Sequence, residues 1–179
     1  MRSDDDSRRS RIRRTEALPG ATLPSAGLDF GTLEVFADGL RNEVGLAFDA
    51  HGVLWGVENG ADNLARADLG GDIHNDNPGE ELNRFPESQA GEHWGYPFCW
   101  SEFVLPSGRG QGQGTVWAWP SFINDGTHTD AWCRAHTNPS ELSMPAHSAP
   151  LGMTFYRHQV RAAPKLLTQH VVNRQCQSK

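Results

Sequence analysis

The main part of the sequence has no long apolar run and no compact cluster of basic residues. No segment approaches the roughly 20 apolar residues of a membrane-spanning helix, and no apolar signal segment follows Met1. Six arginines lie in residues 1–14, so the rest of the chain holds 10 basic against 19 acidic residues. Such an acidic chain lacks the clustered cations that neutralise phosphates. We therefore expect neither a membrane span nor a nucleic-acid partner.

Cysteine is scarce, with three residues and no C-x-x-C spacing, which argues against a zinc site or a dithiol redox motif. Cys99 and Cys133 each stand beside a tryptophan. We predict that their Cα atoms lie within about 7 Å, the reach of a disulfide, and that Cys176 is unpaired. A bridge would close a loop of about 35 residues and stabilise the fold by roughly 3–4 kcal/mol. Two buried thiols fit the sequence nearly as well.

The two ends of the chain differ from its middle. Residues 1–14 are rich in arginine, but three consecutive aspartates interrupt them, whereas transit peptides are poor in acids. We predict a disordered leader over residues 1–30, because it does not alternate like a strand. Residues 158–179 contain no glycine and are predicted to be a divergent, disordered or weakly helical tail.

Glycine and proline are abundant, at 19 and 11 residues, and this composition predicts an all-β chain of short strands and turns. Apolar runs at 33–36, 44–48 and 53–57 are predicted strands, the last two joined by a hairpin loop at 49–52. Residues 59–80 have few apolar side chains and are predicted to be a long loop.

The second half of the chain repeats this alternation of turns and strands. TVWAW at 115–119 is a predicted strand between glycine-rich and Asp-Gly turns. SAPLGMTFY at 148–156 is similar to NEVGLAFD at 42–49, since each places a glycine before an apolar strand start. Repeated entry strands are typical of a β-propeller.

A longer combination of motifs runs through residues 33–156. FADGLRNEVGLAFDAHGVLWGVENG is followed by EELNRF, HWGYP and SAPLGMTFY. In this order the motifs resemble the glucose/sorbosone dehydrogenase family, soluble quinoproteins that fold as six-bladed β-propellers. The resemblance implies a partial propeller of about three blades over residues 31–157.

The resemblance also implies a cofactor. The family oxidises a sugar or another alcohol by passing a hydride to pyrroloquinoline quinone, a tricarboxylate held by arginine side chains and calcium. Arg41, Asn42 and Asn59 occupy positions implied to bind this quinone, and a guanidinium group does bind carboxylates bidentately. The alternative is that Arg41 forms an ion pair between blades and Asn42 caps a turn.

Two calcium positions are implied in the same way. The carbonyl groups of Gly60 and Ala61 match the turn that holds the cofactor-bridging ion, and Glu81 with the Trp94 carbonyl matches a second, structural position. Oxygen atoms of this kind are the ligands that calcium prefers. Three features depart from the family pattern: Glu43 and Ala61 each stand where the family has proline, and HWGYP exchanges the two aromatic residues of YGWP.

The expected catalytic base is missing. The family uses a histidine on a blade upstream of the Arg-Asn segment, and no histidine precedes Phe36 here. His147 matches a blade-entry position and is interpreted as structural. The other histidines are expected at the surface, namely His51, His74, His93, His128, His136, His158 and His170.

The predicted function is therefore a fragment of a quinoprotein dehydrogenase that is inactive alone. Two alternatives remain: a non-catalytic propeller fragment that binds carbohydrate or another partner, and a truncated chain without a function of its own. The family is extracellular or periplasmic, although this chain shows no signal peptide.

Overall fold

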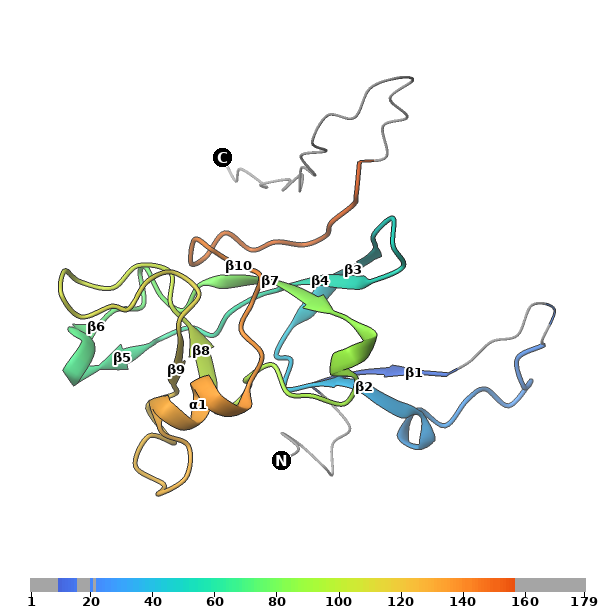
Figure 1. Cartoon of the computed structure of the whole chain (residues 1–179), viewed down its shortest axis with the longest axis horizontal. Coiled ribbons are helices and arrows are strands. Elements are labelled where there is room, and N and C mark those ends of the chain that lie inside the picture. Colours follow the sequence, from blue (N-terminus) through green and yellow to red (C-terminus); the bar gives the residue numbers. More distant parts are fainter. Residues whose placement is uncertain (1–9, 16–19, 21, 157–179) are drawn as a thin grey trace.

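A computed structural model describes the protein over residues 10–15, 20 and 22–156. Short strands dominate, and one α-helix lies among the described residues (Figure 1). The strands are β1 (Arg11–Arg14), β2 (Glu34–Asp38), β3 (Glu43–Phe48), β4 (Leu54–Glu58), β5 (Ala65–Arg66), β6 (Gly71–Asp72), β7 (Glu80–Phe85), β8 (Cys99–Ser101), β9 (Val116–Ala118) and β10 (Leu142–Met144), and the helix is α1 (Asp130–His136).

The largest sheet is four-stranded and antiparallel, in the order β10-β7-β4-β3. Three two-stranded sheets accompany it: β1-β2, β5-β6 and β8-β9 (Figure 1). The predicted hairpin is confirmed as β3-β4. The Asp49 carboxylate closes its loop by accepting from the N–H groups of His51 and Val53, at 2.8 and 3.0 Å. Local turn chemistry of this kind is readable from the sequence.

Strand β1 corrects the predicted leader, because Arg11–Arg14 lies within residues 1–30 and pairs antiparallel with β2. Arg11 donates to Asp38 at 3.1 Å, both side chains being buried, and Arg14 forms ion pairs with Glu34 and Glu87. These partners lie far along the chain, so local sequence does not reveal the strand. The predicted tail at 158–179 lies outside the described residues.

The long loop predicted at 59–80 is also partly wrong. It contains the β5-β6 hairpin, and its Leu64, Leu69 and Ile73 are buried against Trp100 and Trp117. These widely spaced apolar residues form a core only after the chain folds back on itself.

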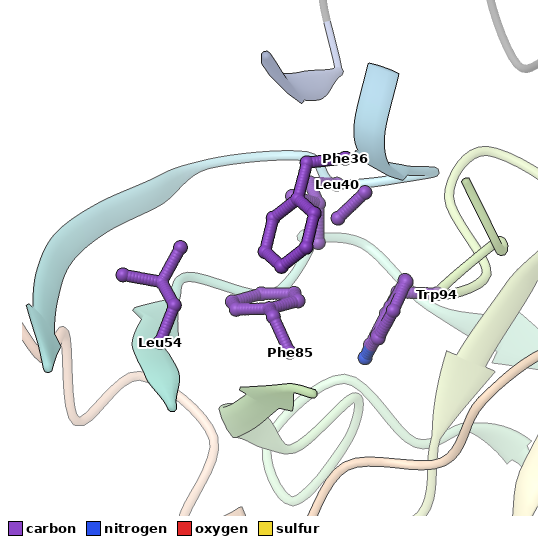
Figure 2. Packing of buried hydrophobic residues seen from close by; sticks show 6 residues of the cluster. Phe36, Leu40, Leu54, Phe85 and Trp94 are labelled. Carbon is purple, nitrogen blue, oxygen red and sulfur yellow. The ribbon is translucent and has the colours of Figure 1, made fainter. Parts of the chain in front are cut away.

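The core next to the four-stranded sheet is aromatic (Figure 2). Phe36 and Leu40 come from β2 and the residues after it, and they pack on Leu54 and Phe85 of the sheet. The ring centroids of Phe85 and Trp94 lie 4.9 Å apart. This cluster packs the start of β4 and the end of β7, where Leu54 pairs with Phe85, against β2 and the segment that follows it.

A disulfide joins Cys99 of β8 to Cys133 of α1, with the Cα atoms 5.9 Å apart, which confirms the predicted pair. Helix α1 was not expected from an all-β composition. It begins after Thr129, whose side chain accepts from the Trp132 N–H group, and Asp130 adds a negative charge to its first turn. Both are favourable at a helix N-terminus.

The segment 148–156 forms no regular strand in the described residues, contrary to the prediction; only Phe155 makes a single bridge. Instead it crosses the sheet so closely that a Cβ atom on Gly45 would lie 2.6 Å from the Gly152 Cα atom. Within the described residues β3 is the edge of its sheet, and its Leu46 and Phe48 side chains are exposed.

Candidate functional site

A cavity of about 300 Å³ opens where the chain leaves β4 and enters β7. Its lining comes from residues near these strand ends and from the segments after Trp94 and around β8 and β9. The lining residues include Arg41, Glu58, Gly60, Ala61, Pro78, Gly79, Glu81, Trp94, Tyr96, Trp100, Ser101, Trp119 and Phe122.

Arg41 is the cationic side chain of this cavity. It follows the buried Leu40, which anchors the end of β2 in the core. Its Nη1 atom donates to the carbonyl oxygens of Asn59 and Gly60, at 3.0 and 2.6 Å. Its backbone N–H group donates to the Glu58 carboxylate at 2.7 Å. The guanidinium group therefore lies against the turn that follows β4.

The turn at Asn59 and Gly60 is held from several directions. The Gly60 N–H group donates to the Glu80 carboxylate at 2.6 Å, and the Asn59 side chain donates to the Pro150 carbonyl oxygen at 3.1 Å. The Asn59 N–H group donates to the Asn42 carbonyl oxygen at 3.1 Å. These bonds leave both turn carbonyl groups directed at the Arg41 guanidinium group.

Three carboxyl groups from three neighbouring strands surround the buried amide of Asn83. Its Nδ2 atom lies 3.2 Å from Glu43, 3.5 Å from Glu58 and 3.3 Å from Glu81. The register explains this arrangement, because Glu58 stands opposite Glu43 on one side and Glu81 on the other. Glu43, the residue in place of the family proline, thus joins a buried acidic cluster beneath the cavity.

Burial changes the ionisation of this cluster. It raises the pKa of Glu43 from 4.5 to about 7. Burial, with the nearby charges of Glu81 and Glu43, also raises the pKa of Glu58 well above its usual range. The pKa of Glu81 is raised by burial too. Several carboxyl groups that are buried close together cannot all ionise, because burial and mutual repulsion disfavour the charged forms. The cluster therefore retains protons near neutral pH.

Five of the seven predicted site residues line this one cavity, namely Arg41, Gly60, Ala61, Glu81 and Trp94. The other two do not. Asn42 lines a separate cleft beside β1, and the Asn59 side chain is engaged with Pro150, although its carbonyl group meets Arg41. The predicted site residues did not include Glu58, Glu80 or Asn83, whose roles depend on strand register.

The histidines lie elsewhere. His93 and His128 are buried, which corrects the expectation that both are at the surface. His93 accepts from the Gly95 N–H group at 2.9 Å, and burial lowers its pKa to about 4. His128 stacks on Phe98 with ring centroids 3.9 Å apart. His147 is exposed and donates through Nε2 to the His74 carbonyl oxygen at 2.8 Å, outside the cavity.

Two kinds of feature are absent from the described part of the chain. No three His, Cys, Asp or Glu side chains are arranged to hold a metal ion. No helix there is long and apolar enough to cross a bilayer.

The sequence is similar to those of two pyrroloquinoline quinone-dependent dehydrogenases. A pyrroloquinoline quinone-dependent pyranose dehydrogenase of Coprinopsis cinerea is 35% identical over 139 residues, which is 74% of this chain and 19% of the relative. A pyrroloquinoline quinone-dependent sugar dehydrogenase of Hypocrea jecorina is 35% identical over 146 residues, 75% of this chain and 32% of the relative. The chain thus spans about a fifth to a third of these relatives.

Two solved structures are similar to the structure of this chain. The holo pyrroloquinoline quinone domain of the Coprinopsis cinerea pyranose dehydrogenase matches with a TM-score of 0.70 and 33% identity, over 83% of this chain and 37% of that domain. A calcium structure of the Trichoderma reesei AA12 carbohydrate-active enzyme matches with a TM-score of 0.72 and 32% identity, over 83% and 38%. The fold is accordingly part of a β-propeller, as predicted.

These findings confirm the resemblance to quinone-dependent sugar dehydrogenases. The match to a family model extends well beyond the cavity, since it covers residues 2–169. The chain therefore belongs to the TrAA12-like family.

Proposed function

We propose that this chain is part of a dehydrogenase that oxidises a sugar or another alcohol with pyrroloquinoline quinone and calcium. One observation carries the proposal: the Arg41 guanidinium group meets the carbonyl oxygens of Asn59 and Gly60 at the cavity. Relatives named for pyrroloquinoline quinone and a calcium structure of a similar enzyme support it.

The residues present fit both groups. The carbonyl oxygens of Asn59 and Gly60 both accept from the Arg41 guanidinium group, so they already converge on one positive charge. The oxygen ligands of a calcium ion must converge in the same way. Once released from them, a guanidinium group is suited to a carboxylate of the quinone. A volume of about 300 Å³ lies at the lower end of the range for small-molecule sites.

Each residue has a distinct role in this proposal. When bound, the quinone accepts a hydride from the carbon that bears the substrate hydroxyl group. Arg41 binds and orients a cofactor carboxylate, and the Gly60 carbonyl group binds calcium, with Ala61 next to it as a further carbonyl ligand. Glu81 and the Trp94 carbonyl group remain candidates for the second calcium, and Asn42 is a weaker candidate because it lines another cleft.

In this proposal the chain alone does not complete the oxidation. No histidine lines the cavity among the described residues, so no imidazole there takes the hydroxyl proton as the hydride leaves. The 179-residue chain is accordingly proposed to supply part of a cofactor site rather than a complete active site.

A titration of the chain with the quinone tests this proposal. Trp94, Trp100 and Trp119 line the cavity, so calcium-dependent binding should quench tryptophan fluorescence. Arg41→Ala should weaken this quenching, whereas the control Arg109→Ala, whose exposed side chain contacts the Asp68 carbonyl group, should not. If quenching is the same with and without calcium, and the same in Arg41→Ala as in wild type, the proposed site is refuted. Dye-linked sugar oxidation by the chain alone would refute the proposal that the chain supplies only part of an active site.

A second candidate function, carbohydrate binding without redox chemistry, is favoured by the aromatic wall of the cavity. Tyr96, Trp119 and Phe122 line it together with Glu81 and Ser101. Aromatic rings with hydrogen-bonding groups nearby suit the faces and hydroxyl groups of a sugar. Sugar-induced fluorescence changes that need neither quinone nor calcium would support this function instead.

An extracellular location is proposed as well. The disulfide between Cys99 and Cys133 supports it, because such bonds persist in oxidising compartments.

A further inference from the structure

Two buried carboxylates hold the main chain on the two sides of the Arg41 contact. Glu58 accepts a hydrogen bond from the Arg41 N–H group at 2.7 Å. Glu80 accepts one from the Gly60 N–H group at 2.6 Å. Both glutamates are almost fully buried, at 6% and 5% exposure, so neither contact is a loose surface pair.

Glu58 is fixed by its place in the sheet. It is the last residue of β4, and strands β3 and β7 flank it through Glu43 and Glu81. Arg41 lies 17 residues earlier, in the connection between β2 and β3. One carboxylate therefore ties this connection to the end of a central strand, which sets the point from which the Arg41 side chain starts.

Glu80 gathers two separate turns. It is the first residue of β7, and besides Gly60 it accepts from the backbone N–H groups of His147 and Ala149. His147 and Ala149 have positive φ angles of 59° and 45°, a conformation that residues other than glycine rarely adopt. Backbone N–H groups that converge in this way form an anion-binding nest. The Glu80 carboxylate fills that nest and so joins the Gly60 turn to the 147–149 turn.

These contacts have a common geometric consequence. Fixing the Arg41 N–H group fixes the start of the guanidinium side chain, and fixing the Gly60 N–H group fixes the turn whose carbonyl oxygen that guanidinium group contacts at 2.6 Å. Preorganised ligands of this kind bind more tightly because less ordering remains to be done on binding.

We propose that Glu58 and Glu80 are positioning residues, which hold Arg41 and the Gly60 carbonyl group in the geometry that receives the cofactor and its cation. This inference rests on the proposed function for the identity of the ligand. The position of the two N–H groups does not depend on it. What each site requires is a hydrogen-bond acceptor, so glutamine should replace glutamate where alanine cannot.

Amide hydrogen exchange of the 179-residue chain, measured by NMR, tests the positioning directly. Glu58→Ala should speed exchange at Arg41, and Glu80→Ala at Gly60, each by about tenfold or more, since the hydrogen bond that protects the amide is lost. Exchange at Gly60 should change less in Glu58→Ala, and exchange at Arg41 should change less in Glu80→Ala. Glu58→Gln and Glu80→Gln should restore protection, and the exposed control Glu141→Ala should change neither amide.

Terbium, a luminescent substitute for calcium, provides a second readout. Excited through the tryptophans of the cavity, it should bind the wild-type chain. Binding should weaken about tenfold in the two alanine variants, and the two glutamine variants should stay within about threefold of wild type. If Glu80 instead ligated the ion directly, glutamine would lose binding as alanine does, and the positioning role would be refuted.

The outcomes separate the two proposals. A wild-type chain that binds no terbium would count against the proposed calcium site, while the exchange pattern would still decide the positioning. Unchanged exchange at Arg41 and Gly60 in the alanine variants would overturn the positioning inference. If those variants do not fold, the glutamine variants decide it, because rapid exchange in them would contradict the requirement for an acceptor alone.

Discussion

Replacing Glu43 by glutamine should stabilise the fold above pH 7 and leave its stability unchanged near pH 4. The Glu43 carboxyl group is buried beside Glu58 and Asn83, and its pKa is raised from 4.5 to about 7. A raised carboxyl pKa means that the folded state binds the proton more tightly. Its stabilising effect is complete below pH 4.5 and is lost as the pH rises through 7.

The magnitude follows from the shift. A rise from 4.5 to about 7 corresponds to about 3 kcal/mol of stability lost by the wild type between these pH values. Glutamine has the same shape, retains an acceptor for the Asn83 amide, and carries no charge at any of these pH values. The variant should therefore be more stable than wild type by up to about 3 kcal/mol at pH 8.

Urea unfolding followed by circular dichroism, between pH 4 and 8.5 in EDTA, measures this difference. The quantity of interest is the free energy of unfolding of the variant minus that of the wild type, which removes the contribution of all other groups. Glu141→Gln, at an exposed carboxyl group, is the matched control and should give a small, constant difference. A difference for Glu43→Gln that is the same at pH 4 and pH 8 would refute the buried, protonated cluster.

Three further predictions concern stability and binding. Replacing Cys99 and Cys133 by serine should lower the free energy of unfolding by roughly 3–4 kcal/mol, since the bridge closes a loop of 34 residues; equal urea midpoints before and after reduction would contradict this. Arg41→Ala should weaken quinone binding by about 1.5–3 kcal/mol, measured as the change in titration midpoint. Gly39→Ala should destabilise the fold strongly, because φ there is 74° and the added Cβ atom would clash with the His93 ring; a melting temperature equal to wild type would contradict this.

Sequence reasoning succeeded where the determinants are local. The β3-β4 hairpin follows from two apolar runs and the Asp49 turn. Arg41, Gly60 and Ala61 were assigned through the family resemblance, and they line one cavity. It failed where partners are distant. Strand β1 depends on ion pairs to residues at least 20 positions away, so its own arginines predict only a charged segment.

The acidic cluster shows the same limit within the site. Glu43, Glu58 and Asn83 are separated by 15 residues or more, and only the register of β3, β4 and β7 brings them together. Helix α1 was missed for another reason. Its capping residues, Thr129 and Asp130, stand in a segment that also has the composition of a turn, and seven residues are too few to show helical periodicity.

The exposed edge of β3 has a practical consequence for the chain in solution. Leu46 and Phe48 are 49% and 61% exposed and stand on one face of a strand that pairs on one side only in the described part of the chain. Apolar side chains beside unpaired backbone groups are a template for association with further strands. We therefore expect self-association to increase with protein concentration, and Leu46→Lys or Phe48→Lys, which would place like charges on two approaching copies, should reduce it.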